Sequence, residues 1–412
     1  MKKKYLLMLP AFSIATITPS WVHALEDVPA AAKVNADAEF AEAKPAKEMY
    51  DKLAAYITKK AKEVGEEVDG KAILEAMGFN DVTSYAMSSQ KDGTEWKNLM
   101  FLHNGGSDKG IFSLFGKKDA EFSAPSMCPA GTDLVMQVDL DLRTVEALIR
   151  NVMKAANAPA EDQKEFEDGL KEEIPQLGMN ASDMLAKMNV RLNIAIDLDD
   201  KVKLALPMVG ELDKPHMVIR LDGLAWIWDK MGDKMIAESG MPLVKKEEGG
   251  VITYSLPPEM AAQFMGYLPL MSVDKNKDQI WIASSPDFLK RSMAGTETLA
   301  ESIAYKATIQ GLAQKGNAMG YMSKDFVDLL LQLSETAKEA GMMEQLGEAK
   351  PEIDKALADL KLIKQGSIST MSRTEDGILF TERGVKNLQE RMKELDEAMK
   401  KMEEGLEGLK PQ

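Results

Sequence analysis

The feature that most constrains this chain is an apolar strand followed at once by an amphipathic helix, a combination that occurs three times. The copies are DLVMQVDLDLRTVEALI at 133–149, HMVIRLDGLAWIWDKM at 216–231 and AMGYMSKDFVDLLLQL at 318–333. Further along the chain, each copy is followed by strand-like runs joined by a turn. The pattern predicts an α+β fold of repeated strand–helix–hairpin units, with antiparallel sheets that carry long helices on one face.

Two acids, Asp139 and Asp141, end the strand of the first copy. Paired carboxylates beside a buried strand suggest a metal site or an acid/base pair. The second copy has Asp222 at the position of Asp139, but the third copy has Lys324 there. A charge that reverses between copies argues against a shared metal ligand. Asp141 precedes a predicted helix at 143–149, where an acid accepts hydrogen bonds from the exposed N–H groups of the helix start.

Composition changes along the chain predict five parts. Residues 25–48 are rich in Ala, Glu, Lys and Pro with little periodicity, which favours a flexible arm. The expected domain boundary is the sequence Leu-Asp-Lys-Pro at 212–215. The expected parts are a signal peptide, a flexible acidic and Ala-rich arm, two α+β domains and a C-terminal heptad helix, at residues 1–24, 25–48, 49–212, 213–384 and 385–412.

Three short β-rich runs lie between residues 82 and 116, namely VTSYAMSS, WKNLMFLH and GIFSLFG. Asp92-Gly93 and the two glycines at 105–106 supply the positive-φ positions that tight turns need. We therefore expect a meander of about three strands in this region.

The N-terminus has the pattern of a secretory signal. Residues 2–4 are lysines, an apolar run follows, and Val-His-Ala at 22–24 ends in the small-x-small pattern of a cleavage site. The run is too short to span a membrane, and no later segment approaches the roughly 18 apolar residues that a span requires. We expect secretion into a periplasm or out of the cell, with no transmembrane segment.

The chain is acidic, with a formal net charge of −15 at pH 7. Removal of residues 1–24 takes away three lysines and no acids, so the charge of the mature chain is −18. An acidic chain repels nucleic-acid phosphates, which bind to cationic patches. Nucleic acid is therefore excluded as an expected partner.

Cys128 is the only cysteine, so stability must come from packing and not from an internal disulfide. The 29 methionines suit this role, because their flexible side chains fill irregular cores. His103 and His216 are the only histidines beyond residue 24, which argues against a multi-histidine metal site. Either could pair with Cys128 as base and nucleophile, but the cysteine lies in a proline-bounded loop with no helix start to activate its thiol.

Asp274, Asn276 and Asp278 occupy the first, third and fifth positions of a calcium-loop pattern. The sixth and twelfth positions hold Gln279 and Ser285 in place of the Gly and Glu that the loop requires. A hairpin turn is the favoured interpretation. The sequence therefore gives no catalytic, cofactor-binding or metal-ligating residue, and no cofactor is expected.

The segment at 385–412 has the clearest periodicity in the chain. Its apolar residues recur at alternating steps of four and three, which is a heptad seam, and most other positions are charged. The seam predicts a surface for a partner or for self-association, and the alternative is a helix docked on the protein's own sheet. The seam residues are Leu388, Met392, Leu395, Met399 and Met402, continued by Leu406 and Leu409.

Trp226 and Trp228 lie where the second copy passes from strand to helix. Two neighbouring tryptophans can line a pocket for a carbohydrate or an apolar ligand. On a helix they point about 200° apart. The alternative is therefore that one lies in the core and the other packs under a loop.

Two segments carry a resemblance. AILEAMGFNDVTSYAMSSQKDGTEWKNLMFLHNGGSDKGIFSLFG and the following PAGTDLVMQVDLDL lie within 72–150, and SSPDFLKRSMAGTETLAESIAYKATIQGLAQKGNAMGYMS occupies 284–323. Their order resembles uncharacterised secreted proteins of the Planctomycetes–Verrucomicrobia type, over about three quarters of the mature chain. The resemblance implies secretion and assigns no activity and no site residues.

These observations favour a secreted or periplasmic, non-enzymatic binding or scaffold protein of the cell envelope. Its expected partner is another envelope protein, a second copy bound through the C-terminal helix, or an apolar ligand. The alternative function is a carrier of apolar ligands such as lipids in a cleft lined by Met and Leu. A hydrolase that uses carboxylates or Cys128 is the least favoured function.

Overall fold

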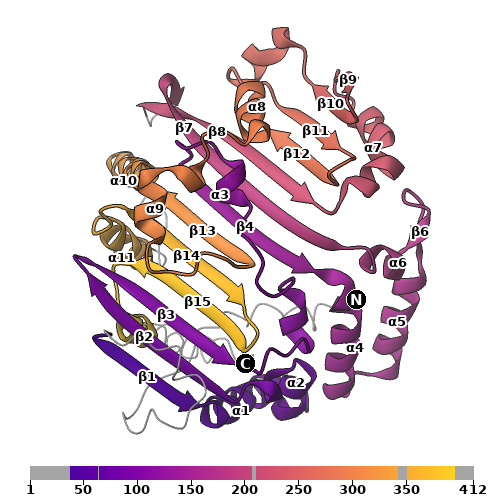
Figure 1. Cartoon of the computed structure of the whole chain (residues 1–412). Coiled ribbons are helices and arrows are strands. Elements are labelled where there is room, and N and C mark those ends of the chain that lie inside the picture. The colour runs from indigo at the N-terminus through magenta and orange to yellow at the C-terminus, as the bar shows by residue number, and fades with distance from the viewer. Residues whose placement is uncertain (1–37, 64, 207–209, 342–349, 395–412) are drawn as a thin grey trace. The chain divides into compact units, whose positions relative to one another are not determined.

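The computed structural model describes residues 38–63, 65–206, 210–341 and 350–394 (Figure 1). It confirms the expected α+β class, with a large antiparallel sheet and many helices. The chain divides into two compact units, each built from segments that are distant in sequence. Among the described residues, unit 1 comprises those within 38–112, 147–171 and 375–394, and unit 2 comprises those within 113–146 and 172–374.

Unit 1 contains antiparallel strands in the order β1 (Phe40–Pro45), β2 (Ser84–Asp92), β3 (Glu95–His103) and β15 (Gly377–Gly384). The predicted turn between β2 and β3 is confirmed, with Gly93 at φ +67°. Helices α1 (Lys47–Glu63) and α2 (Gly70–Ala76) pack against each other. Leu74 and Phe112 are fully buried in this unit, and the rings of Phe112 and Phe79 meet edge to face at 5.6 Å.

Two expectations for this region are wrong. The run GIFSLFG does not form a strand, because residues Gly110–Leu114 form a 3-10 turn, η3, that buries Ile111 and Phe112. The second partner of β3 is instead β15, which arrives from the far end of the chain. Residues 40–45 of the expected arm are strand β1, paired with β2, while residues 25–37 lie outside the described part of the chain.

Two further helices lie mostly or wholly in unit 1. They are α4 (Val145–Ala155), which begins in unit 2, and α5 (Ala160–Lys171). Arg150 of α4 binds both carboxylate oxygens of Glu167 on α5, at 2.5 and 3.0 Å.

Unit 2 is built on an antiparallel sheet in the order β14-β13-β4-β7-β8-β12-β11-β10-β9 (Figure 1). The bounds of these strands are β4 Leu134–Asp141, β7 Asn189–Leu206, β8 Gly210–Asp222, β9 Val244–Glu248, β10 Val251–Ser255, β11 Leu270–Asp274, β12 Gln279–Ala283, β13 Ala318–Ser323 and β14 Gly366–Arg373. A separate small ribbon pairs β5 (Glu173–Ile174) with β6 (Met179–Asn180).

Strands β7 and β8 form a long hairpin at the centre of unit 2. Their pairing runs from Arg191–Asp222 to Leu206–Gly210, with a register shift between Asp199 and Lys203. The division expected after residue 212 falls inside β8 and within unit 2. The reason is that Pro215 stands in a strand, opposite Leu198, and not in a linker.

Helices follow three of these strands directly. Strand β4 passes through the 3-10 turn η4 (Leu142–Thr144) into α4, β8 leads into α7 (Ala225–Ser239), and β13 leads into α10 (Lys324–Glu339). Ser323 caps α10 by accepting a hydrogen bond from the Phe326 N–H at 3.0 Å. The other α-helices of unit 2 are α3 (Ala124–Met127), α6 (Ala181–Leu185), α8 (Pro286–Ala294), α9 (Ile303–Ile309) and α11 (Lys350–Leu360). Within the described residues, no helix has the length and apolar character to cross a bilayer.

Candidate functional site: two unlike faces of one sheet

The central strands of unit 2 present two faces of different chemistry, because side chains alternate along each strand. One face carries Val135, Ala195, Val218 and Tyr321, which are fully or almost fully buried. Helices α3, α8 and α9 cover this face, and all three contribute buried apolar side chains to the same core (Figure 1). We call it the covered face.

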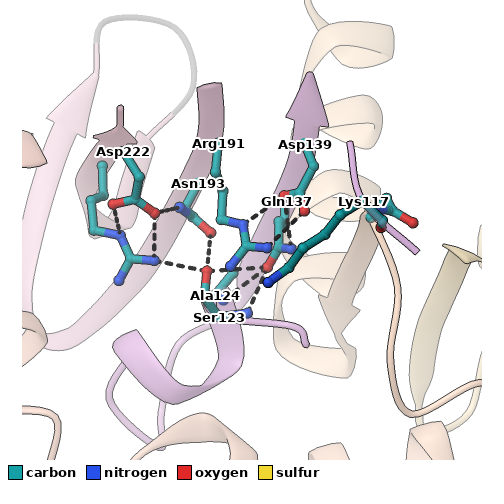
Figure 2. A network of polar contacts seen from close by, with 10 residues as sticks. Lys117, Ser123, Ala124, Gln137, Asp139, Arg191, Asn193 and Asp222 are labelled. Atoms are coloured by element: carbon teal, nitrogen blue, oxygen red, sulfur yellow. Dashed lines mark hydrogen bonds and ion pairs between the residues drawn. The ribbon is translucent and has the colours of Figure 1, made fainter. Parts of the chain in front are cut away.

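Polar side chains continue along the covered face beyond this core (Figure 2). Arg191 binds both oxygens of Asp139, at 2.6 and 2.7 Å. The side chain of Gln137 accepts hydrogen bonds from the N–H groups of Ser123 and Ala124, at 2.8 and 3.1 Å. These contacts fasten the N-terminal end of α3 to strand β4 and join β4 to β7.

The same network extends to strand β8. Arg220 donates to the hydroxyl of Ser123 at 2.7 Å and to Asp222 at 3.0 Å, and Ser123 donates to Asn193 at 3.0 Å. Burial raises the pKa of Asp222 above its usual value, although Arg220 opposes this. Buried polar groups normally have hydrogen-bond partners, and most of the buried groups here find their partners within the network. The network has the character of a structural contact that holds neighbouring strands together, because each charged group faces an opposite charge.

Cys128 lies beside this network and is fully buried. Burial raises the pKa of its thiol to about 12, although the nearby Arg220 acts in the opposite direction. A thiol with that pKa is protonated at neutral pH and is a poor nucleophile. The arrangement therefore gives no support to a hydrolase that uses Cys128.

The opposite face of the same strands is apolar at every position of three parallel rows. Residues that lie directly opposite each other in an antiparallel pair point to the same side of the sheet, so the rows can be followed across the strands. The middle row is Gly320, Met136, Ile194, Ile219, Ile282 and Met271. The upper row is Ala318, Val138, Leu192, Leu221, Ile280 and Val273. The lower row is Met322, Leu134, Ile196 and Met217. We call this surface the apolar face.

Much of the apolar face is accessible to solvent. Met136, Met217 and Ile282 are 45%, 39% and 37% exposed, and most of their neighbours are half-buried. An antiparallel sheet normally turns its apolar side to the core and its polar side to water. Here the charged and amide side chains lie on the covered face, and the accessible face has none in these rows. A contiguous exposed apolar patch of a few hundred Å² on a protein surface is often functional.

Helix α7 covers one end of the apolar face. Trp228 packs there with Val273 and Ile280, and its ring meets that of Tyr254 edge to face at 5.5 Å. Helices therefore lie on both faces of the unit 2 sheet, not on one as expected. The physical reason is that the opposite face also carries apolar side chains, among them Leu221, Val273 and Ile280, and packing α7 on them removes them from water.

The two tryptophans have different surroundings. Trp228 is buried in the core under α7, and no partner for its indole N–H is found among the described residues. Trp226 is half-buried, donates to the Gly223 carbonyl at 3.1 Å and lies 5.5 Å from the Lys187 ammonium. The two side chains do not form one pocket. Trp228 packs under α7 at one end of the apolar face, and Trp226 packs beside the turn at Gly223.

An acidic pocket of about 860 Å³ lies near the tip of the β7–β8 hairpin and the first turns of α10. Eight of its lining residues are Asp or Glu. Arg291 pairs with Asp197 at 2.7 Å, and Lys203 pairs with Asp213, so part of this charge is neutralised. Within the described ranges, no three or more His, Cys, Asp or Glu side chains are grouped so that they could hold a metal ion.

Asp133 is, like Asp197, a buried carboxyl of this pocket. It accepts hydrogen bonds from the Ser323 hydroxyl at 2.6 Å and from the Leu198 N–H at 2.8 Å. Burial raises its pKa from 3.8 to about 6, and Asp197 and Asp325 act in the same direction, while the two hydrogen bonds lower it. Asp133 thus links β4, β7 and the start of α10 through one ionisable group.

Other residues singled out from the sequence are structural. Asp141 accepts hydrogen bonds from the N–H and guanidinium of Arg143, so its predicted role at the helix start is confirmed. Asp274 accepts from the N–H groups of Asn276 and Lys277, which confirms the hairpin turn between β11 and β12.

The two histidines also lie in structural settings. His103 contacts the hydroxyl of Thr83 at 2.8 Å in unit 1. His216, in unit 2, lies 3.7 Å from Asp199, and burial lowers its pKa.

The heptad seam is described only at its start. The chain is helical from residue 388 to residue 394. The Leu388 N–H donates to Ser89 at 2.9 Å, and Met392 is buried. Leu395, Met399 and Met402 lie outside the described residues, as do Leu406 and Leu409.

Comparison with protein-family models, with curated proteins and with solved structures gave no significant match. The resemblance to secreted proteins of the Planctomycetes–Verrucomicrobia type therefore stays an expectation. The functional interpretation depends on the geometry of unit 2, and the apolar face is its most distinctive feature.

Proposed function

We propose that this chain is a secreted, non-enzymatic protein of the cell envelope that binds an apolar partner on the apolar face of unit 2. One observation carries the proposal: the accessible side of the sheet is apolar in three rows, while the charged network lies on the covered side. Leaving such a surface in water costs free energy, so a function must account for it.

The composition of the surface supports binding. Met136, Met217, Met271 and Met322 supply flexible, polarizable side chains that adapt to partners of different shape. The network on the covered face links the strands on the other side of the sheet. The apolar face can therefore be accessible to solvent while the strands that form it stay rigid.

The repeated strand–helix–hairpin unit is part of the proposal, because it explains how the surface is built. Each of the strand–helix steps β4–α4, β8–α7 and β13–α10 has at most three residues between strand and helix. The three strands place Met136, Ile219 and Gly320 in the middle row of the apolar face. Duplicated units of this kind would give one continuous apolar surface.

Secretion is also part of the proposal. Residues 1–24 have a basic start, an apolar run and a cleavage-site pattern. Packing without disulfides is compatible with that compartment, because the buried Cys128 has no second cysteine to pair with. A periplasm or the outside of the cell is where such a protein would meet the apolar components of an envelope.

The test is binding of a neutral apolar dye such as Nile red to the full mature chain. We expect fluorescence enhancement with the wild type and at least about tenfold weaker binding with Met136→Glu, because a charge in the middle row opposes burial. Met265→Glu is the matched control, since Met265 is 63% exposed but lies outside the apolar face. Absence of dye binding, or equal binding by the two folded variants, would refute the proposal.

A further inference from the structure

Resting on that proposed function, we infer that the partner is a zwitterionic diacyl phospholipid whose acyl chains lie across the strands of the apolar face. The middle row runs over six consecutive strands, from Gly320 on β13 to Met271 on β11. Five spacings of about 4.8 Å make it about 24 Å long. An acyl chain reaches about half of the roughly 30 Å hydrocarbon core of a bilayer, so it fits along the row.

The area of the face argues against a folded protein partner. Three rows separated by about 7 Å are about 14 Å wide, which gives an area of about 340 Å². A standard protein–protein interface needs about 800 Å² from each partner. The core under helix α7 already contains Val273 and Ile280 of the upper row, and Leu221 of the upper row and Met271 at the end of the middle row pack against that core, which reduces the free area further. A second copy of this chain would therefore bury too little here for a stable dimer.

The uniform chemistry of the face argues against a single polypeptide segment. An extended peptide needs hydrogen-bond partners, and the side chains of the three rows offer none. An amphipathic helix satisfies its own backbone, but a 100° apolar stripe on a cylinder of about 10 Å diameter is only about 9 Å wide. Its polar flanks would lie on the outer rows, against residues such as Val138 and Ile196. Two acyl chains side by side are apolar over the whole width.

The charge of the protein selects the class of lipid. The chain has a net charge of −15, and the acidic pocket lies in the same unit as the face. A fatty-acid carboxylate or an anionic headgroup would be repelled by this field. A zwitterionic headgroup carries no net charge and avoids that repulsion.

The experiment measures binding of short-chain phosphatidylcholines as monomers, by titration calorimetry and native mass spectrometry of the full mature chain. We expect a complex with one lipid per protein. Diheptanoyl phosphatidylcholine should bind about tenfold more tightly than the dihexanoyl form, because two additional methylenes are buried. Met136→Gln and Ile282→Gln should each weaken binding about fivefold or more, and Met265→Gln, outside the face, should not change it.

Each outcome distinguishes this inference from the proposed function. If Nile red binds at Met136 but phosphatidylcholine does not bind, the lipid inference is overturned and the proposed function stands. Tighter binding of a fatty acid than of phosphatidylcholine would overturn the choice of headgroup. A doubled mass that Met136→Gln restores to the monomer would show that a second copy occupies the face. Circular dichroism of Met265→Gln and Met136→Gln should match the wild type, so that a loss of binding reports the face and not the fold.

Discussion

At the scale of residues, the ion pair between Arg191 and Asp139 fixes the network that backs the apolar face. The side chain of Asp139 is 8% exposed, and Arg191 is its bidentate partner. Arg191→Ala leaves this carboxylate buried without its cation, which is expected to reduce the free energy of unfolding by about 3 kcal/mol. Urea denaturation measures the change.

The chain offers a matched control for this prediction. Arg143 pairs with Asp141 in the same way, but the Arg143 side chain is 52% exposed, so Arg143→Ala should cost about 1 kcal/mol or less. Equal losses for the two arginines would contradict the view that burial makes the Arg191 pair important.

We expect Asp133 to make the stability of the protein depend on pH. Its pKa of about 6 lies above the value of 3.8 for a free carboxyl. Between these values the folded state holds more protons than the unfolded state, so this group's contribution to stability falls as pH rises and is least favourable above pH 6. Asp133→Asn cannot ionise. The free energy of unfolding of Asp133→Asn minus that of the wild type should therefore be about 2 kcal/mol larger at about pH 7.5 than at about pH 4.5, so the variant gains stability relative to the wild type as pH rises.

Denaturation of both proteins at the two pH values gives this difference directly. Other acids, such as Asp92 and Asp141, have lowered pKa values and lose stabilising interactions in acid, but they are common to both proteins and cancel. A relative stability that does not change with pH would mean that Asp133 titrates normally.

At the scale of elements, the sequence predicts strands and helices well where periodicity is local. The strand–helix step at 133–149, the turn at Asp92-Gly93 and the turn after Asp274 all follow from patterns a few residues long. The run GIFSLFG is different, because a short apolar segment can pair in a sheet or pack as a turn. The position beside β3 was taken by β15, nearly three hundred residues away in sequence, and no local pattern reveals that competition.

The candidate site shows the same limit. The alternation of Val135, Gln137 and Asp139 with Met136 and Val138 is visible in the sequence. The usual rule assigns the side with the acids to solvent, and the structure buries it against Arg191 instead. Which face is covered depends on helices that pack from elsewhere in the chain, such as α3 and α8. Alternation therefore finds the two faces and cannot say which one is open.

At the scale of the whole molecule, the remaining question is whether the chain acts alone or as an oligomer. The seam begins at Leu388 and Met392, which both belong to unit 1. The Leu388 N–H donates to Ser89, and Met392 is buried. Only Leu395, Met399 and Met402, with the two leucines that follow, remain as candidates for self-association. A sequence pattern of about three heptads predicts only a short coiled coil, which is weak by itself.

We therefore expect the chain to be monomeric at micromolar concentration, and the double substitution Met399→Glu and Met402→Glu to leave its mass unchanged. Light scattering coupled to size-exclusion chromatography measures both. A dimer in the wild type that the double substitution dissociates would assign the seam to self-association and support the scaffold function. A dimer that resists it, but is dissociated by Met136→Gln, would assign the contact to the apolar face. Because the two surfaces lie in different parts of the sequence, these variants separate an oligomeric scaffold from a monomeric lipid-binding protein.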